Sequence, residues 1–447
     1  MPISRDAPVI NVSSFLDTGA WGPYQKLLTL LAALAIIFDG FDLQILGFAM
    51  PSIMREWHLA RAAFAPIAAL GLVGMGLGSP FAGYCGDRLG RRLTVIACVM
   101  VFGAATIATA FCHTLTELGA LRTLAGLGVG GALPNASALT ADFAPMRRRA
   151  MAVMLTLLCV PIGGMIAGLV AAYILPSMGW RALYVVGGAA PLLIALLLLV
   201  ALPESPRYLA RFPERRDELI RLLVRMGHAV SAHTVFDSES ETKTESGHIR
   251  ALFAPEFLRD TLGLWLAFFA NLVGVYLVFS WLPSMLTSKG LDIITATSGL
   301  SAYNFGGIFG ILICTAGVTV LGSRRPLLWV AAGGTAAAVA LELMHIAPRG
   351  GHTMLIGGFG VEGFFAHALQ TTLFALAAYV YPTRIRATGI ACAAGVGRAG
   401  GMLGSLGGAA VIHAGSGAYL AVLAVSMIFA FVGLAIVRRH YPARAKG

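Results

Sequence analysis

Seven ionisable residues interrupt long apolar stretches of this sequence: Asp39, Asp42, Arg122, Glu342, Glu362, His367 and Arg398. A charged side chain within a membrane costs several kcal/mol, so such residues are rare there and mark solute or ion pathways by default. Glu342 lies near the end of its stretch, where water can reach it. The other six are the first candidates for chemistry.

Asp39 and Asp42 are three positions apart, so on a helix they would share one face. Asp42 and Arg122 are expected at a similar height in the membrane. A second carboxylate disfavours ionisation of the first, whereas a nearby guanidinium favours it. The three residues therefore suit a carboxylate that takes up and releases a proton. A permanent structural ion pair is the alternative.

Arg398 lies within a run of small residues at 395–401, which leaves room for close packing or for a ligand. A buried guanidinium binds a carboxylate through two parallel hydrogen bonds. Glu362 could supply that carboxylate from within the protein, and an acidic solute is the other source. Further candidates for the wall of a solute cavity are His367, Gln370, Phe364, Trp281 and Asn304. Aromatic residues at such positions also serve simply as packing.

Residues 83–92 read Gly-Tyr-Cys-Gly-Asp-Arg-Leu-Gly-Arg-Arg and follow one of the apolar stretches. Their glycines permit a tight turn between closely packed helices. Asp87 and the arginines can form ion pairs that hold two halves of a protein together in one state and separate in another. Anchoring at the inner membrane surface explains the arginines but not Asp87. The predicted gate residues are Gly83, Asp87, Arg88, Gly90, Arg91, Arg92, Asp142 and Arg386.

The composition indicates a protein embedded in a lipid bilayer. Of its 447 residues, 57% are hydrophobic and 12% are charged, and the mean hydropathy is +0.80. A soluble domain has about 25% charged residues. Twelve stretches are long enough for a helix to cross the hydrocarbon core, which takes about 20 residues. They are 25–50, 64–84, 94–112, 116–141, 150–175, 181–202, 261–286, 295–321, 327–346, 353–379, 388–413 and 418–437.

The net charge of +11 predicts an orientation rather than a nucleic-acid partner. Most of the 32 Lys and Arg residues fall in loops on one side of the membrane if both chain ends are placed in the cytoplasm. Basic residues collect on the cytoplasmic side of short loops. The N-terminus shows no pattern of a cleaved signal peptide. We expect a multi-pass protein of the cell membrane, the inner membrane in a bacterium.

The two halves of the sequence resemble each other. The pattern Pro-x-Arg-x-Arg-Ala, followed after twelve residues by Gly-Gly-Met, begins at Pro145 and again at Pro382, an offset of about 237 residues. A parallel repeat of two six-helix halves is typical of one large class of transporters, whose solute site lies near the membrane midplane between them. The predicted fold is all-α, with twelve membrane-spanning helices in two pseudo-symmetric six-helix bundles.

Three regions follow from this division. Residues 1–202 are expected to form the first bundle, 203–260 a cytoplasmic central loop, and 261–447 the second bundle with a cytoplasmic tail. Within the central loop, 207–226 predicts an amphipathic helix at the inner membrane surface. The Ser-, Thr- and Glu-rich stretch 231–247 has the composition of an unstructured segment.

The sequence resembles the major facilitator superfamily over essentially its full length. Residues 83–92 match the loop signature of that superfamily between the second and third helices. Residues 122–134, with Arg122 followed by a stripe of glycines and Pro134, match its fourth-helix signature. Residues 203–207, Pro-Glu-Ser-Pro-Arg, resemble the element after the sixth helix in sugar-porter-like members.

Within the superfamily, the sequence is similar to the bacterial aromatic acid:proton symporter family. The similarity rests on residues 39–42 (Asp-Gly-Phe-Asp), on Trp281-Leu-Pro, and on 379–389 followed by Gly-Arg at 397–398. It implies uptake of benzoate-like or hydroxybenzoate-like anions with protons, by alternating access. It also implies roles for Asp39 and Asp42 in coupling and substrate handling, for Asp87 in the gate, and for Arg386 and Arg398 in the functional motif of the second half.

One departure concerns the second-half counterpart of the gate loop. Residues 321–326 read Leu-Gly-Ser-Arg-Arg-Pro and lack the acidic residue and second glycine common in that family. The resemblance therefore implies a gate in the second half that is weaker or differently built.

Other solutes and other classes of protein remain as alternatives. A major facilitator transporter of a sugar, an aliphatic acid or an exported drug fits the same architecture. A sensor or membrane enzyme is disfavoured, because the sequence has no signalling domain, metal-ligand cluster or nucleophile–base pair. No phosphate-binding loop is found, which argues against ATP as the driver. We expect no enzyme activity, metal, cofactor or nucleic-acid partner, while the solute and the direction of transport stay open.

Overall fold

The computed structural model describes residues 9–10, 12–19, 21–227, 230, 235–236, 249–344 and 352–443. Within them the chain is almost entirely helical. The helices of the first half are α1 (Val12–Thr18), α2 (Pro23–Glu56), α3 (Arg61–Leu89), α4 (Arg91–Thr109), α5 (Leu115–Phe143) and α6 (Met146–Ala201). Those of the second half are α9 (Pro255–Ser288), α10 (Ile293–Leu321), α11 (Arg324–Leu343), α12 (Thr353–Val380), α13 (Thr383–Ala414) and α14 (Ser416–Ile436).

Twelve of the described helical segments are long enough to span a membrane. Nine of the described helices combine sufficient length with sufficient hydropathy, and α6 is one of them. α6 holds two spans, because Gly179 interrupts it at φ +76°, a conformation that residues with a Cβ atom rarely adopt. α5 and α13, which carry Arg122 and Arg398, have 29 and 32 residues and complete the set. The all-α fold with twelve spanning helices is confirmed.

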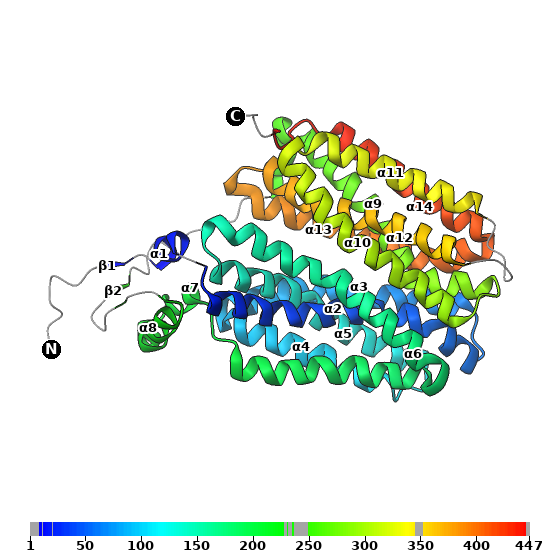
Figure 1. The fold of residues 1–447 in the computed structure, drawn as a ribbon, viewed down its shortest axis with the longest axis horizontal. Helices are drawn as coiled ribbons and strands as arrows, with labels where there is room; N and C mark the ends of the chain where they lie inside the picture. Colours follow the sequence, from blue (N-terminus) through cyan, green and yellow to red (C-terminus); the bar gives the residue numbers. More distant parts are fainter. Residues whose placement is uncertain are drawn as a thin grey trace.

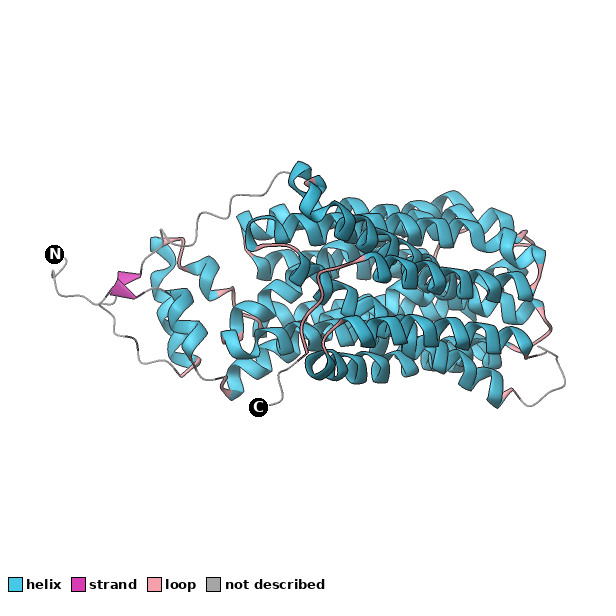
Figure 2. Cartoon of the chain, turned by 90° about the horizontal axis from the view of Figure 1, so that it is seen from above, coloured by secondary structure: helices cyan, strands magenta, loops and turns pink. Residues whose placement is uncertain are grey.

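The helices form two bundles that lie side by side (Figure 1), and most of them run along one long axis (Figure 2). Helices α2–α6 build the lower layer of Figure 1, and α9–α14 build the upper one. In the first bundle α2 packs on α6 and α3 on α5, and in the second α9 packs on α13 and α10 on α12. The two bundles are thus built from the same helix pairs in the same chain order, as the internal repeat requires.

The repeated glycines show why the pattern recurs. A Cβ atom on Gly163 of α6 would overlap the carbonyl group of Ile37 on α2. A Cβ atom on Gly400 of α13 would overlap the carbonyl group of Phe269 on α9 in the same way. Small residues let two membrane helices approach backbone to backbone. The repeat in the sequence therefore encodes an equivalent close helix contact in each bundle, and the pseudo-symmetry of the two bundles is confirmed.

We name the two ends of the molecule by their elements. The α8 end carries α7 (Pro206–Leu209), the 3-10 turn η1 (Pro213–Arg215) and α8 (Arg216–Arg225), and it lies at the left of Figure 1. The α2–α3 end is the opposite one, where α2 passes into α3. The expected single helix over 207–226 is wrong: the chain turns after Leu209 and restarts at Arg216. α8 alone is amphipathic, and it buries leucines of one face.

Two short segments complete the description. β1 (Val9–Ile10) and β2 (Val235–Phe236) form a two-stranded parallel pair, the one departure from an all-helical chain among the described residues. A 3-10 turn, η3 (Ile249–Phe253), precedes α9. Apart from β2, the stretch 231–247 lies outside the described residues, as does the end of the expected span 327–346.

The bundles share a hydrophobic core toward the α2–α3 end. Phe48 and Trp180 of the first bundle belong to the same buried cluster as Phe279 and Trp281 of the second. From the first bundle, only residues in the half nearer the α2–α3 end join that cluster. Toward the α8 end the first bundle has a separate core, which it shares with α1 and α8. The two bundles are therefore joined more closely at the α2–α3 end than at the α8 end.

Candidate functional site

Asp42 lies on α2 in a fully compensated site. It is 1% exposed, and Arg122 of α5 lies 3.3 Å from its carboxylate. Thr106 of α4 donates a hydrogen bond to the same carboxylate at 2.5 Å, and Arg122 also donates to the Asp42 backbone oxygen at 3.2 Å. The prediction that Asp42 and Arg122 lie at the same height is confirmed. The two charges and the hydroxyl group compensate the Asp42 carboxylate inside the first bundle, while Arg122 Nε has no hydrogen-bond partner.

Asp39 lies one helical turn from Asp42 but in a different environment. Its side chain is also 1% exposed, yet its Oδ1 atom has no hydrogen-bond partner. Within the described residues it forms no ion pair. An ionised carboxylate held without compensation in an apolar interior carries a large free-energy cost. Asp39 is therefore the carboxylate of α2 that an added proton would relieve.

Arg398 lies on α13 where the second bundle faces the first. Its side chain is partly exposed, and the one hydrogen bond it makes within the described residues goes to Ser79 Oγ of α3 at 3.4 Å. That bond crosses between the bundles. Glu362, the expected internal partner, makes no ion pair with it. Most N–H groups of the guanidinium therefore have no hydrogen-bond partner within the described residues, and they can bind another acceptor.

Tyr276 lies near both of these groups. It lies on α9, is partly exposed, and lies within electrostatic range of both Arg398 and Asp39. Its ring meets that of Phe279 edge to face, with the ring centres 5.8 Å apart. The arrangement brings a cation, a carboxylate and aromatic surface to the boundary between the bundles. Such a combination suits a small aromatic solute with an acidic group.

Asn304 was predicted to line the solute cavity. In the structure its side chain is hydrogen-bonded to another side chain instead. Its side-chain amide exchanges two hydrogen bonds with that of Gln44 on α2, at 2.7 and 3.0 Å. Both residues are completely buried. The pair connects α2 of the first bundle to α10 of the second. In this conformation Asn304 holds the bundles together rather than facing open space.

The second bundle contains a cluster of buried polar groups on α10 and α12. Glu362 Oε2, His367 Nε2 and the Tyr303 hydroxyl group have no hydrogen-bond partner. His367 Nδ1 contacts the Gly363 carbonyl oxygen at 3.0 Å, and its ring lies 5.0 Å from that of Tyr303. Gln370 accepts a hydrogen bond from Asn271 at 2.8 Å. Glu362 and His367 thus resemble Asp39 in lacking compensation.

Two predicted cavity residues have structural contacts instead. Trp281 is completely buried, and its indole group donates to the Ser405 carbonyl oxygen at 2.8 Å, which joins α9 to α13. Phe364 is partly exposed and meets Phe365 edge to face. In this conformation both side chains pack within the second bundle.

The predicted gate residues form their ion pairs within the first bundle. Arg91 pairs with Asp142 at 2.6 Å, and Asp142 also accepts a hydrogen bond from Ser205 at 2.6 Å. Arg207 approaches Asp142 at 3.6 Å and pairs with Asp17 of α1 at 2.8 Å. These contacts tie the loop after α3 to α5, α1 and the central segment. None of the ion pairs among the described residues crosses to the second bundle.

The remaining gate residues have looser contacts. Asp87 is exposed and forms no ion pair within the described residues, and Arg88 stacks over the ring of Tyr84.

Arg386 is exposed and donates to the Tyr381 carbonyl oxygen at 3.3 Å. Gly83 and Gly90 flank the loop, and Arg92 binds a carbonyl group of α6. The cross-bundle pairing expected for Asp87 is thus absent in this conformation.

Glu204, in the segment between α6 and α7, holds this loop in place. It accepts hydrogen bonds from the backbone N–H groups of Arg92 and Ser205 at 3.1 and 2.9 Å. Burial raises the pKa of Glu204, and these two hydrogen bonds oppose the rise. The acidic residue of the Pro-Glu-Ser-Pro-Arg element thus caps the start of α4.

The sequence pattern of the Major Facilitator Superfamily matches residues 32–350, which is more than half of the chain. The chain belongs to the major facilitator superfamily. The match runs through both bundles, so it covers the helices that carry Asp39, Asp42 and Arg122 as well as α9 and α10.

The transporter is similar over nearly its full length to carriers of aromatic acids. It is 34% identical to a gallate transporter of Pseudomonas putida, over 96% of this chain and 93% of that protein. It is 32% identical to the 4-hydroxybenzoate transporter PcaK of Pseudomonas aeruginosa, over 91% and 90% of the two chains. It is also 32% identical to the 3-(3-hydroxy-phenyl)propionate transporter of Escherichia coli, over 91% and 92%. The predicted relationship to aromatic acid transporters is confirmed.

The fold is also similar to that of solved structures. The xylose transporter XylE from E. coli, in a partially occluded inward-open conformation, superimposes with a TM-score of 0.75 over 95% of this chain and 99% of its own. At 19% identity this likeness shows the fold alone. The relatives and the structural neighbour are membrane transporters, and the prediction of a transporter rather than an enzyme is confirmed.

Several residues of this site in the transporter were not predicted from the sequence. Gln44 carried a usable signal, because a polar side chain inside an apolar stretch needs a partner. Tyr276 carried none, since aromatic residues are common in that stretch. Ser79 and Thr106 are small hydroxyl residues of the kind that often bond back to their own helix. Only the packing of the helices shows which partners these four residues meet.

Proposed function

We propose that this transporter imports a small aromatic carboxylate, such as a hydroxybenzoate, together with a proton. The relatives that it resembles along its whole length carry gallate, 4-hydroxybenzoate and 3-(3-hydroxy-phenyl)propionate, which are all aromatic acids. The observation that carries the proposal is a contrast within one small region. Asp42 and Arg122 neutralise each other, whereas Asp39 and Arg398 keep unused hydrogen-bonding capacity at the boundary of the bundles.

Arg398 supplies the recognition of the acid. Its planar guanidinium matches a carboxylate with two parallel hydrogen bonds, and such charge-assisted bonds are about twice as strong as neutral ones. Tyr276 lies within electrostatic range of it, and the ring of Phe279 meets that of Tyr276. We propose that the carboxylate of the solute binds Arg398 while its ring packs against these residues.

A proton makes the import of an anion favourable. Moving one negative charge into a negative interior costs about 2.3 kcal/mol per 100 mV, and a proton carried in the same direction cancels that charge. Asp39 is the proposed carrier, because Asp42 is already committed to Arg122 and Thr106. Glu362 and His367 form a second uncompensated pair in the other bundle, and we propose that they take part in the same proton traffic.

Alternating access would move the two bundles relative to each other. We propose that residues 1–202 and 261–447 act as the moving units, with 203–260 linking them. The α8 end is proposed to face the cytoplasm of a bacterial cell, with the protein in the inner membrane, because basic residues gather there. The shared core at the α2–α3 end then corresponds to closure on the outer side.

Uptake of labelled aromatic acids into membrane vesicles, with and without an imposed pH gradient, tests the proposal. Wild type is expected to accumulate a hydroxybenzoate only when the outside is more acidic, and not to accumulate xylose. Asp39→Asn should abolish this accumulation but keep exchange of labelled for unlabelled solute, because exchange needs no net proton transfer. Arg398 and its neighbours are untouched in that variant.

The matched control is Glu342→Gln, which neutralises an exposed carboxylate on α11. It should accumulate solute like wild type. Full gradient-driven accumulation by Asp39→Asn would remove Asp39 from the coupling role. Accumulation of xylose but of no aromatic acid by wild type would contradict the proposed solute class.

A further inference from the structure

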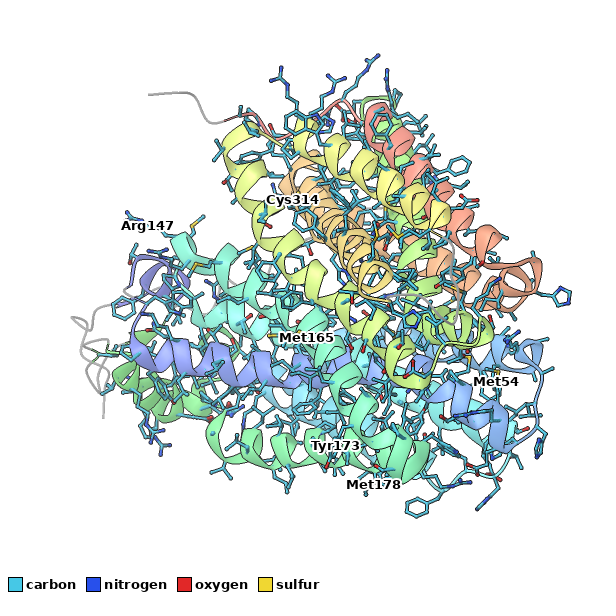
Figure 3. The ribbon with its side chains drawn as sticks, turned by 45° about the vertical axis from the view of Figure 1, so that its right-hand side comes forward. Met54, Arg147, Met165, Tyr173, Met178 and Cys314 are labelled. Carbon is cyan, nitrogen blue, oxygen red and sulfur yellow. The ribbon has the colours of Figure 1, made fainter. Side chains whose placement is uncertain are left out.

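A large cavity opens at the α2–α3 end, away from the polar groups described above. Its volume is about 1220 Å³, and the ends of α2, α9 and α13 and the starts of α3 and α10 surround it. Both bundles therefore contribute to its wall. Met54, which lies at this end in Figure 3, Leu59, Leu291 and Leu406 give it apolar sides. Such a space is larger than a single aromatic ring requires.

The charges that line this cavity are mostly positive. Arg55 and Arg61 supply the positive charges; both are exposed, and neither side chain has a hydrogen bond or an ion pair within the described residues. Asp292 is the one acidic residue in the wall, and its carboxylate accepts a hydrogen bond from the Thr295 backbone at the start of α10. The cavity thus joins apolar sides to cationic groups without internal partners.

The neighbouring carboxylate does not neutralise these groups. Glu56 follows Arg55 in the sequence, but it pairs with Arg181 and accepts the indole hydrogen bond of Trp180 at 2.7 Å. Both contacts hold the end of α2 against the second span of α6. Arg55 and Arg61 therefore remain available to an anion that enters the cavity from solvent.

The cavity is separate from the site around Arg398. Gly47 of α2 lies so close to the Phe279 carbonyl group of α9 that no Cβ atom would fit between them. This contact joins the bundles between the cavity wall at Pro51 and the polar site near Asp39. Along α13, Leu406 lies about 12 Å beyond Arg398 at 1.5 Å per residue. An anion in the cavity therefore cannot contact Arg398 in this conformation.

We propose that this cavity is a peripheral binding site that captures aromatic carboxylates from the outer solution before the central site opens to them. The inference rests on the function and orientation proposed above. The ring of the solute packs on the apolar sides, and Arg55 and Arg61 bind its carboxylate. A cationic funnel with low-dielectric walls raises the local concentration of an anion and its rate of entry. The site is present while the contact between Gly47 and Phe279 keeps the bundles closed on this side.

The experiment compares uptake and efflux in the variant Arg55→Gln/Arg61→Gln. Initial uptake rates of labelled 4-hydroxybenzoate are measured over a range of outside concentrations, at low and at moderate ionic strength. The KM for uptake is expected to rise about tenfold at low ionic strength, with the maximal rate retained. The KM for efflux, which starts from the other side, should stay unchanged. Added salt should raise the KM less in the variant than in wild type, since screening weakens steering.

Lys289→Gln is the matched control for the single variant Arg61→Gln. It removes one positive charge at the same end of the molecule, but Lys289 does not line the cavity. Its uptake KM should stay within about twofold of the wild-type value, because solvent screens a partly exposed charge outside the cavity. A larger KM effect of Arg61→Gln than of Lys289→Gln supports the cavity as the site.

Two outcomes would overturn the inference alone. An unchanged uptake KM in Arg55→Gln/Arg61→Gln, with wild-type transport of hydroxybenzoate, would show that the cavity captures nothing. An equal rise of the uptake and efflux KM values would place the effect at the central site. If wild type carried no aromatic acid, the proposed function itself would fail, and the peripheral site for that solute would fail with it.

Discussion

Asp42, a buried carboxylate of the first bundle, has two partners, whereas Glu362, a buried carboxylate of the second, leaves one oxygen atom without any. Asp42 has a cation at 3.3 Å and a hydroxyl donor at 2.5 Å. In the second bundle Glu362, His367 and Tyr303 each leave a buried polar atom without a hydrogen bond. The two carboxylates thus differ although their bundles are built from the same helix pairs: the charge of Asp42 is compensated within the protein, and that of Glu362 is not.

Asp39 shows that the contrast follows individual partners rather than bundles. It shares a helix face with Asp42 but lacks the cation that Asp42 has. Arg398, which bonds Ser79 of the other bundle, lies at the boundary between the bundles, and Asp39 lies on α2, which packs against α9 of the second bundle. Partnered groups are expected to support stability, and unpartnered ones to support transport. Variants that separate these two effects test the comparison.

The largest effect is expected when the compensated site is broken. Arg122→Ala leaves Asp42 buried without its cation, which typically costs about 3–5 kcal/mol. We expect a large loss of thermal stability in detergent, with loss of transport as a consequence. The double variant Asp42→Asn/Arg122→Gln should recover much of the stability, because neither charge remains. Equal stability of Arg122→Ala and wild type would contradict the structural role of the pair.

Arg398, a cation without an ion pair within the described residues, is expected to matter for binding rather than for stability. Arg398→Ala is expected to leave thermal stability nearly unchanged but to weaken binding of aromatic carboxylates about 10- to 100-fold, as loss of charge-assisted hydrogen bonds does. Binding of the matching amides should fall much less. Arg398→Lys, which keeps the charge without the planar fork, should be intermediate. The same loss for acids and amides would remove Arg398 from the anion site.

The amide pair between the bundles tests compensation of neutral groups. Gln44→Met or Asn304→Leu leaves the other amide buried and unpaired, at a cost of about 1–3 kcal/mol each. The double variant should be nearly as stable as wild type, since both polar groups are then gone. Thermal denaturation of the three variants gives the coupling between the two residues. Strictly additive losses would show that the reciprocal hydrogen bonds contribute no coupling.

The smallest effect is expected at Glu204, where burial raises the pKa. The folded protein then holds a proton on Glu204 that the unfolded chain releases, so this contribution to stability falls as pH rises from the ordinary glutamate pKa through the raised one. Relative to Glu204→Gln, wild type should lose stability over that range. Denaturation at several pH values measures the difference. A stability difference that grows in favour of wild type with rising pH would show that the backbone hydrogen bonds outweigh burial.

The fold could be predicted from the sequence to a large extent. Twelve apolar stretches of sufficient length give twelve spanning helices, because backbone groups in lipid must bond within their own segment. The repeat around Gly163 and Gly400 predicts the pseudo-symmetry, because both glycines serve the same close helix contact. The central segment was predicted less well: the expected helix over 207–226 breaks after Leu209.

The site could be predicted only in part. The pairing of Asp42 with Arg122 followed from their heights in the membrane, which the sequence supplies. The pairing of Asn304 with Gln44 did not, because it depends on how α10 docks against α2. The same holds for Trp281, which lies in the hydrophobic core that the two bundles share and bonds to α13.

The sequence by itself determined that the chain spans a membrane twelve times, that its halves repeat, and which few charges lie within the membrane. These properties depend on local composition and on the length of each apolar stretch. The tertiary structure alone decided which of those charges has a partner. Arg122 reaches Asp42 and not Asp39, and Arg398 reaches Ser79 and not Glu362. Compensation of a buried charge depends on distances of a few ångströms between residues far apart in the chain, and only the packing of the helices sets those distances.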